Sequence, residues 1–229
     1  MEPIQNSKME LFSLEKIGMR LQPDILWRLP IQKGERKIAF TFDDGPYPQS
    51  TYPILDLLDR YHVRATFFVT GGNLELHPLT AQTVAGRGHQ LANHGWSHKL
   101  SIGMTSEKFR QELLQLEDLA YTESIPLQKY YRPPYGIMTR KQFLDARDMG
   151  YKVVVGDIYP RDSQKKSADF IVNDVLRRVD AGSIIILHDG IPSNQGGKYE
   201  YNTLEALGIL LPRLVDAGYE FVDSSGFSI

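Results

Sequence analysis

The sequence predicts an α/β fold built on a parallel sheet of about seven strands. From residue 36 onward, short apolar runs alternate with stretches whose apolar residues recur every three or four positions. Strands and helices in such alternation form right-handed βαβ units, which place the strands parallel to one another. Polar residues of the types used in catalysis directly follow several of the strands. A closed or nearly closed barrel and a doubly wound open sheet both satisfy this alternation.

Seven short segments predict the strands of this sheet. They contain many β-branched and aromatic residues, and Gly or Pro marks many of their ends. The segments are Lys37–Phe42, Ala65–Val69, Gln90–Ala92, Lys129–Tyr131, Val153–Val155, Ser183–Leu187 and Tyr219–Val222.

Apolar residues at helical spacing predict helices between the strands. Three such faces are formed by Phe109, Leu113, Leu116 and Ala120, by Ile171, Val175 and Val179, and by Leu204, Leu207, Leu211 and Val215. Shorter helices are expected over residues 50–61, 78–86 and 139–148.

The first 35 residues are expected to form a helical extension that packs on the barrel. Leu14, Ile17 and Leu21 recur at helical spacing ahead of the first predicted strand. No linker or internal repeat interrupts the alternation that follows, so residues 36–229 are interpreted as one domain.

The composition of the chain narrows the chemistry it can perform. A chain of 229 residues can bury a large core without a disulfide or a structural metal, so any metal is expected to be catalytic. The sequence contains no Cys, which leaves His and carboxylate side chains as metal ligands. The formal charge of −2, with no basic block, gives no indication of nucleic-acid binding.

No export or membrane signal is evident in the sequence. Charged residues interrupt the apolar residues of segment 1–20, and no apolar run is long enough to span a bilayer. As written, the chain is expected to be cytoplasmic; if an export signal has been removed, the cell envelope or the exterior is the alternative. Nothing in the sequence specifies an oligomeric state.

The segment Thr41–Pro46 (TFDDGP) directly follows the first predicted strand. Asp-Gly and Gly-Pro are common turn formers, so a plain turn is one interpretation. Consecutive side chains at a strand end point to opposite sides, so one of Asp43 and Asp44 could bind a metal while the other faces the reacting centre.

His94 and His98 follow the third predicted strand in the segment HGWSH. A spacing of four residues lets both imidazoles reach one ion, from a helical turn or from a folded loop. Two structural histidines are the alternative. Combined with a carboxylate from another strand end, the pair would form a two-His, one-Asp set with open positions for water and substrate, as catalytic zinc requires.

Two further polar segments follow strands. In LHDG at 187–190, His188 ends an apolar run, and an imidazole suits the role of proton donor to a leaving group. In RPPYG at 132–136, the prolines stiffen the loop and Arg132 can hold a carboxylate. A structural His and a solvated Arg are the alternatives. All strands of a parallel barrel open onto one face, so the four motifs together predict an active site there.

Taken in order, TFDDGP at 41–46, HGWSH at 94–98, RPPYG at 132–136 and LHDG at 187–190 resemble the motifs of the NodB-like polysaccharide deacetylases, carbohydrate esterase family four. The resemblance covers about residues 37–225. It implies a distorted (β/α) barrel and a hydrolase that removes acetyl groups from N-acetylated, and in some members O-acetylated, carbohydrate. The implied substrate is an acetylated glycan or oligosaccharide.

The resemblance also implies a metal site and two proton-transfer residues. Asp44, His94 and His98 would hold one divalent metal, most commonly Zn²⁺, with Co²⁺ or Ni²⁺ as alternatives. Asp43 would be the general base that deprotonates water, and His188 would be the general acid that protonates the departing amine.

Three more roles follow from the same resemblance. Arg132 would hold Asp43 in place. The backbone N–H of Tyr135 would stabilise the oxyanion, and Leu187 would line the pocket for the acetate methyl group.

One segment departs from the family's pattern. The family carries Asp-Trp after the fifth strand, where the Asp braces the catalytic His and the Trp walls the pocket. Gapless register places Asp162 on the Asp and Ser163 on the Trp. Tyr159 is then a candidate for the missing aromatic wall, and Asp157 is an alternative brace for His188.

Two other functions are weighed against deacetylation of sugars. One is hydrolysis of non-sugar C–N bonds on the same fold, and the other is carbohydrate binding by an inactive homologue. The metal ligands, the base and the acid are all present in the sequence, which argues against both.

Overall fold

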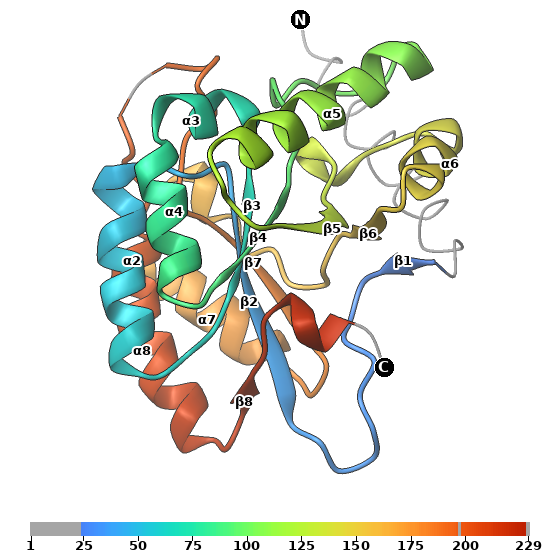
Figure 1. Ribbon diagram of the computed structural model, residues 1–229. Coiled ribbons are helices and arrows are strands. Elements are labelled where there is room, and N and C mark those ends of the chain that lie inside the picture. Colours follow the sequence, from blue (N-terminus) through green and yellow to red (C-terminus); the bar gives the residue numbers. More distant parts are fainter. Residues whose placement is uncertain (1–23, 197, 228–229) are drawn as a thin grey trace, which may run out of the picture.

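A curled parallel sheet forms the centre of the chain, which a computed structural model describes over residues 24–196 and 198–227 (Figure 1). The leading helix expected around Leu14, Ile17 and Leu21 lies outside the described residues. The later part of the predicted 1–35 extension joins the sheet, because Ile25 and Leu26 form strand β1.

The sheet runs in the order β1-β6-β5-β4-β3-β2-β7, and β8 pairs with the first residues of β2. All of its named strand pairings are parallel. The strands are β1 (Ile25–Leu26), β2 (Lys37–Asp43), β3 (Thr66–Val69), β4 (Gln90–Asn93), β5 (Leu127–Tyr131), β6 (Lys152–Val154), β7 (Ile184–His188) and β8 (Glu220–Phe221). Each of the seven predicted strands is therefore confirmed, and β1 is additional.

Isolated backbone bridges link the two ends of the sheet. Ile158, which follows β6, bridges Ile185 of β7, and Arg28, which follows β1, bridges Ser183 just before β7. These bridges curl the sheet into an incomplete barrel, so the predicted distorted (β/α) barrel is confirmed and the doubly wound open sheet is wrong.

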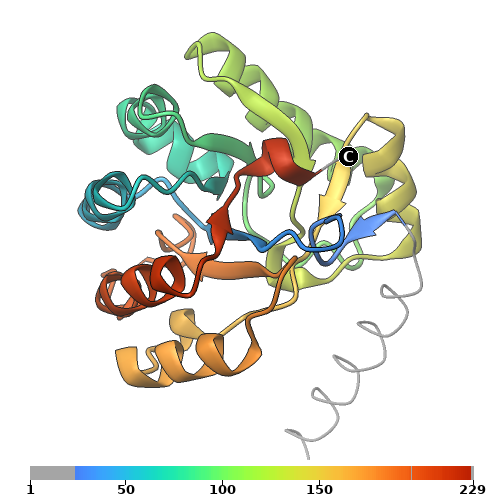
Figure 2. The same cartoon turned by 90° about the horizontal axis from the view of Figure 1, so that it is seen from below.

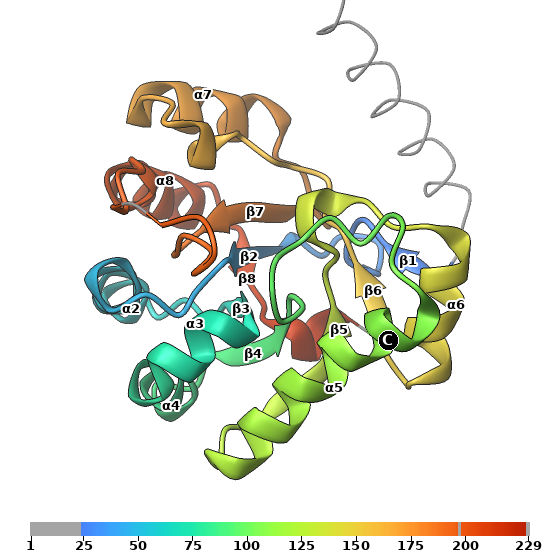
Figure 3. The same ribbon diagram turned by 90° about the horizontal axis from the view of Figure 1, so that it is seen from above.

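Helices cover the outside of the curled sheet (Figures 2 and 3). They are α2 (Pro48–Arg60), α3 (Gly71–Leu76), α4 (Pro78–Gly86), α5 (Ser106–Thr122), α6 (Arg140–Asp148), α7 (Ala168–Arg178) and α8 (Thr203–Asp216). Short 3₁₀ turns occupy Pro134–Gly136, Asp162–Gln164 and Ser224–Phe227. None of the helices in the described part of the chain combines the length and apolar character needed to cross a bilayer.

The buried face of α8 differs from the predicted one. Leu207 and Leu211 are buried as expected, but Leu204 and Val215 are 37% and 42% exposed. The helix instead buries Leu210 and further residues at helical spacing from it. A helix with apolar residues on several sides has no single face that periodicity can define, so the tertiary contacts select it.

Alternation along β2 places one set of side chains outward and the other inward. Ile38, Phe40 and Phe42 belong to the main hydrophobic core between the sheet and its helices, whereas Ala39 packs in a smaller cluster with residues from other strands. Since successive side chains point to opposite faces of a strand, Asp43 shares the inward side with Ala39. The parallel strands deliver their last residues to one rim, which Figure 3 views from above.

Candidate active site

Asp44, His94 and His98 converge at this rim from the ends of β2 and β4. Their ligand atoms all lie within 4.8 Å of one another. The Asp44 Oδ1 atom is 3.5 Å from His94 Nε2 and 3.0 Å from His98 Nε2. All three residues are buried. Two imidazole nitrogens and one carboxylate oxygen at these separations fit a single zinc-type cation with coordination positions to spare.

The ring of His94 is oriented as in metal-binding histidines. Its Nδ1 atom lies 2.7 Å from the carbonyl oxygen of Arg132. A carbonyl only accepts hydrogen bonds, so Nδ1 carries the proton and Nε2 presents its lone pair toward Asp44. This orientation of the His94 ring is a second observation that favours a metal at this site.

The imidazoles of the ligand set favour the charged form of Asp44. Burial alone would raise the pKa of Asp44, but the rings of His94 and His98 beside it outweigh burial and hold that pKa far below its ordinary value. The carboxylate is therefore ionised and available as a ligand.

Two of these residues have left-handed backbone conformations. Asp44 has φ of 74° and His98 has φ of 49°. Side chains with a Cβ rarely adopt this region, and such positions concentrate at functional sites. Asn73 of α3 supports the first of them, because its Nδ2 atom donates to the carbonyl oxygen of Asp44 at 2.5 Å.

Arg132 holds Asp43 beside the ligands. Its Nη1 atom donates to Asp43 Oδ1 at 2.6 Å and to Thr41 Oγ1 at 2.8 Å. The other carboxylate oxygen of Asp43 lies 3.9 Å from His94 Nε2. The guanidinium also lies over the ring of Phe68, with 4.1 Å from its central carbon to the ring centroid. Asp43 is thus fixed through one oxygen and faces the ligand set with the other.

His188 is paired with Asp43 in the register of β2 and β7, so the two residues sit side by side at the rim. Asp162 contacts His188 twice: its Oδ1 is 2.8 Å from the ring Nδ1, and its Oδ2 accepts the backbone N–H at 2.8 Å. Thr203 donates to the same Oδ2. Burial opposes the charged form of His188, but the carboxylate of Asp162 outweighs it and raises the pKa to about 10.

Asp157 lies elsewhere. It accepts the backbone N–H of Ile184 at 2.8 Å and a hydrogen bond from Arg28 at 2.6 Å, near the start of β7 rather than its end. Of the two carboxylates that the sequence offered, Asp162 is therefore the one that contacts His188.

Aromatic rings surround His188 where the family's Trp is absent. The ring centroid of Tyr159 is 5.7 Å from that of His188, and its hydroxyl is 2.7 Å from Ser163 Oγ. The loop after β7 adds Tyr201, 6.3 Å from His188, and Tyr199, which donates to the His188 carbonyl at 2.8 Å. Tyr199 and Tyr201 could not be predicted from the sequence, because no motif marks that loop.

The other two predicted site residues, Tyr135 and Leu187, lie in different environments. Tyr135 is half exposed, adopts φ of 61°, and lies with its ring centroid 4.8 Å from that of His98. Leu187 is fully buried in the main hydrophobic core. Roles in oxyanion binding and in a methyl pocket remain predictions for these residues.

Asp189 is a buried carboxyl group that sequence reasoning left without a role. Thr51 donates to its Oδ2 at 2.5 Å, and Gly45 passes so close that a Cβ there would collide with the carboxylate. Burial raises the pKa of Asp189 to about 7. Its contacts fasten the end of β7 to the first turn of α2, which flanks Asp44.

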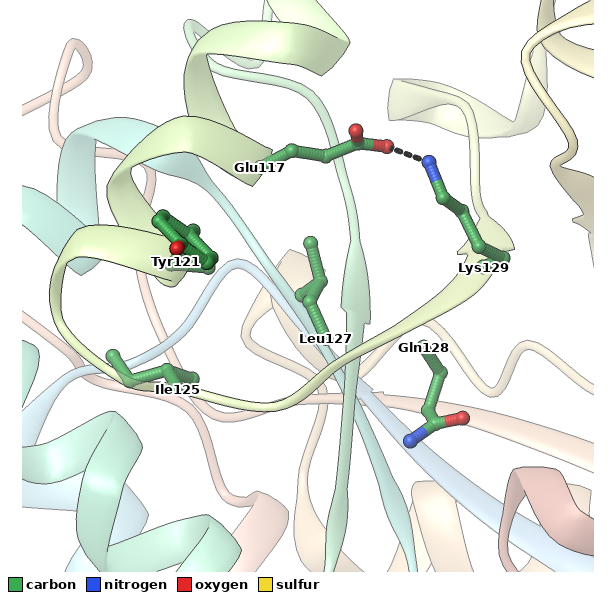
Figure 4. A pocket seen from close by; sticks show the side chains of 7 residues that line it. Glu117, Tyr121, Ile125, Leu127, Gln128 and Lys129 are labelled. Atoms are coloured by element: carbon green, nitrogen blue, oxygen red, sulfur yellow. Dashed lines mark hydrogen bonds and ion pairs between the residues drawn. The ribbon is translucent and has the colours of Figure 1, made fainter.

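A separate pocket of about 220 Å³ lies at the other end of β5 (Figure 4). Its lining residues come from the end of α5 and the start of β5: Glu117, Ala120, Tyr121, Ile125, Leu127, Gln128 and Lys129. An ion pair between Glu117 and Lys129 crosses its edge. It contains none of the candidate site residues and is not part of the candidate active site.

Comparison with known proteins agrees with this geometry. The sequence profile of the polysaccharide deacetylase family matches residues 31–154. A peptidoglycan-N-acetylglucosamine deacetylase of Bacillus cereus is 33% identical over 203 residues, which cover 88% of this chain and 91% of the relative. This chain belongs to the polysaccharide deacetylase family. As a polysaccharide deacetylase it is a hydrolase acting on carbon–nitrogen bonds other than peptide bonds.

Two more relatives of this polysaccharide deacetylase extend the comparison. A chitooligosaccharide deacetylase of Rhizobium leguminosarum bv. trifolii is 33% identical over 190 residues, covering 81% of this chain and 88% of the relative. The crystal structure of a peptidoglycan N-acetylglucosamine deacetylase superposes with a TM-score of 0.82 at 29% identity, covering 90% of this chain and 92% of that one.

Proposed function

We propose that this polysaccharide deacetylase removes acetyl groups from an N-acetylated glycan, with a divalent metal at Asp44, His94 and His98. The observation that carries the proposal is the buried two-His, one-Asp set with Asp43 and His188 side by side next to it. The deacetylases similar to this chain are named for peptidoglycan N-acetylglucosamine and for chitooligosaccharide. We therefore expect an N-acetylated sugar polymer or oligomer as substrate.

The ligand set favours Zn²⁺, and Co²⁺ or Ni²⁺ suit the same donors. A bound cation of this type would polarise the acetyl carbonyl and lower the pKa of a water molecule. The left-handed conformation and placement of Tyr135 beside His98 support a role for its backbone N–H in binding the substrate's carbonyl oxygen.

Asp43 is the proposed general base. One of its oxygens is held by Arg132, so the other is left to accept a proton from the attacking water. Because Arg132 is buried with it, the Asp43 carboxylate keeps an ion-pair partner and a fixed orientation without contact with bulk solvent.

His188 is the proposed general acid. The raised pKa means that its ring is protonated at neutral pH and can give its Nε2 proton to the nitrogen of the leaving amine. Asp162 holds Nδ1, so the ring presents its other nitrogen to the substrate. Tyr159 and Tyr201 flank His188 and are proposed to wall the sugar's binding site in place of the family's Trp.

Acetate release from a panel of acetylated glycans tests the proposal. The panel holds peptidoglycan, chitooligosaccharides, acetylated xylan and a simple N-acetyl amide without sugar. We expect release from N-acetylated glycans, loss of release after chelation and recovery when Zn²⁺ is restored. Asp44→Ala, which removes one ligand, is expected to release no acetate under any of these conditions.

Other outcomes contradict particular parts of the proposal. Release that persists in a chelator would remove the metal from the mechanism. Release from the simple amide alone would favour hydrolysis of non-sugar C–N bonds. Binding of the glycans without turnover, at every metal concentration, would identify an inactive carbohydrate-binding homologue.

A further inference from the structure

The loop between the two histidine ligands has its backbone N–H groups directed at carboxylate and amide oxygens. Gly95 donates to Asn93 Oδ1 at 2.8 Å. Trp96 and Ser97 both donate to Glu112 Oε2 of helix α5, at 3.1 and 2.7 Å. Two consecutive N–H groups therefore share one carboxylate oxygen.

Glu112 also contacts a side chain of the loop, that of Ser97. The hydroxyl of Ser97 lies 2.8 Å from Glu112 Oε1 and 2.9 Å from Oε2. Carboxylate oxygens accept hydrogen bonds, so the two backbone N–H groups and the one hydroxyl proton of Ser97 all find an acceptor on Glu112. Hydrogen bonds to an ionised acceptor are about twice as strong as neutral ones.

The opposite edge of the loop is fastened independently. Gly71 and Gly72, at the start of α3, donate to the carbonyl oxygens of Gly95 and Trp96 at 2.9 and 3.1 Å. Asn194, in the loop after β7, donates to the Ser97 carbonyl at 2.6 Å. Three segments that are distant in sequence, namely α5, the start of α3 and the loop after β7, thus hold residues 95–97, which lead into His98. Among these partners, Glu112 is the only acid.

The ring of His98 depends more than the ring of His94 on the hydrogen bonds that hold residues 95–97. The ring of His94 is held by the Arg132 carbonyl, whereas Nδ1 of His98 has no hydrogen-bond partner among the described residues. His98 also has φ of 49°, a conformation that persists only when its surroundings impose it. Apart from its contact with Asp44 and the neighbouring ring of Tyr135, the His98 ring therefore depends on its backbone for its orientation.

We propose that Glu112 is a positioning residue that sets the metal affinity of the site by fixing the loop 95–97 and, through it, His98. The inference rests on the proposed function, because it presumes a metal at Asp44, His94 and His98. It assigns to α5 a part in the site that none of the sequence motifs indicates.

The affinity for Zn²⁺, measured by competition with a chromogenic chelator, tests this inference. Glu112→Ala removes the carboxylate, and Glu112→Gln keeps its size but loses its charge and one acceptor. Glu107→Gln is the matched control, because Glu107 is an exposed acid in the first turn of the same helix. Partners that support metal ligands typically contribute 10- to 100-fold in affinity.

We expect the dissociation constant for Zn²⁺ to rise about 10- to 100-fold in Glu112→Ala, to rise by less in Glu112→Gln, and to stay unchanged in Glu107→Gln. The absorption spectrum of bound Co²⁺ should shift in the two Glu112 variants, because the His98 ligand is displaced. Ser97→Ala, which removes the hydroxyl contacts and keeps the N–H contacts, should weaken Zn²⁺ binding to a smaller extent and keeps the inference testable if Glu112→Ala does not fold.

A merely structural role would give a different pattern. Glu112 variants with a lower melting temperature without metal, but with wild-type affinity for Zn²⁺ and an unchanged Co²⁺ spectrum, would overturn the inference while leaving the proposed function intact. A wild-type protein that binds no Zn²⁺ would contradict the metal-dependent function itself, and the inference with it.

Discussion

The carboxylate of Asp162 is the neighbouring group that raises the pKa of His188 most. It contacts both the ring and the backbone N–H of His188, and it outweighs the effect of burial on the imidazole. Because the raised pKa is about 10, this ring keeps its proton throughout the neutral range in the metal-free protein. Removal of the negative charge should therefore expose the opposing effect of burial.

We predict that Asp162→Asn lowers the pKa of His188 from about 10 to its ordinary range or below. NMR titration of the histidine rings in metal-free protein measures this change. Asp157→Asn is the control, since Asp157 contacts the start of β7 instead. An equal shift in both variants would contradict the assignment of Asp162 as the partner of His188.

Asp43→Asn should separate catalysis from metal binding. The amide keeps the size of the side chain but cannot accept a proton, so the rate of acetate release should fall by about 10²- to 10⁴-fold. Zn²⁺ content should remain one per chain, because Asp44, His94 and His98 are intact. Loss of the metal together with activity would show that Asp43 acts as a ligand or as a structural support rather than as the base.

The residues of the candidate site differ in how readily they could be predicted from the sequence. Asp43 and His188 end their strands and Asp44 follows directly, and parallel strands bring such positions to one rim. Glu112 could not be predicted, because it is one of several acids in an amphipathic helix and its partners lie 15 and 16 residues away in sequence. The choice between Asp162 and Asp157 also needed the structure, since it depends on which end of β7 each carboxylate reaches.

The start of β4 carries a buried imidazole. His89 precedes this strand, accepts the backbone N–H of Ala65 at 3.3 Å, and packs edge-on against Phe67. Burial, and then the positive charge of Arg64 and Arg87, outweigh the nearby carboxylates of Asp59 and Asp223 and lower the pKa of His89 to about 4. The folded chain therefore favours the neutral form of the His89 ring at the start of β4.

This requirement predicts an acid-dependent loss of stability. Above about pH 6.5 His89 is neutral in both states, so its contribution is fully present; as the pH falls toward 4 the unfolded chain gains a proton that the folded chain does not. The free energy of unfolding should fall by roughly 3 kcal/mol across this window on account of His89. Urea unfolding at a series of pH values measures it.

His89→Asn should flatten that dependence, because the amide oxygen can accept the Ala65 N–H and does not titrate. His62→Asn serves as the control, since His62 is exposed. If the free energy of unfolding falls as steeply with decreasing pH in His89→Asn as in the wild-type protein, other groups cause the acid destabilisation.

Elements were predicted well where their pattern was long, and less well where it was short. The 17 residues of α5 repeat their apolar positions often enough to define one face. The two residues of β1 are too few for any alternation, and α3 has only six residues. For α8 the existence of the helix was clear, but its buried side was set by contact with α7 and α2.

The curl of the whole sheet depends on a close approach of the backbone beside β7. Gly156 has φ of 84°, and a Cβ at this position would come within 2.9 Å of Ile186 Cγ1 and 3.1 Å of the Ile184 carbonyl oxygen. The chain segment that contains Gly156 continues to Ile158, which bridges Ile185. The absence of a side chain thus lets the two ends of the sheet meet.

Gly156→Ala should destabilise the protein more than Gly150→Ala. Both positions have nearly the same φ, 84° and 83°, but Gly150 has open space around its Cβ position. The shared backbone strain costs about 1–2 kcal/mol in each variant. Crowding against β7 should add about 1–3 kcal/mol to Gly156→Ala alone. Equal losses in urea unfolding would show that the close approach does not limit closure.

The barrel could be predicted from the sequence only by combining pattern with motif. Alternating strands and helices fit both a barrel and an open sheet, and the family resemblance favoured the barrel. The contacts that join the sheet's ends, through Ile158 and Arg28, involve single residues in irregular segments. No periodicity marks such residues, so the degree of closure had to come from the structure.

The left-handed conformations of Asp44 and His98 lower the stability of the fold at two residues of the proposed metal site. Each costs a residue with a Cβ about 1–2 kcal/mol, and glycine would avoid most of that cost. Glycine would also delete a proposed metal ligand. Variants of this chain selected only for heat resistance are therefore expected to lose the proposed metal site, and any such selection should retain a screen for acetate release.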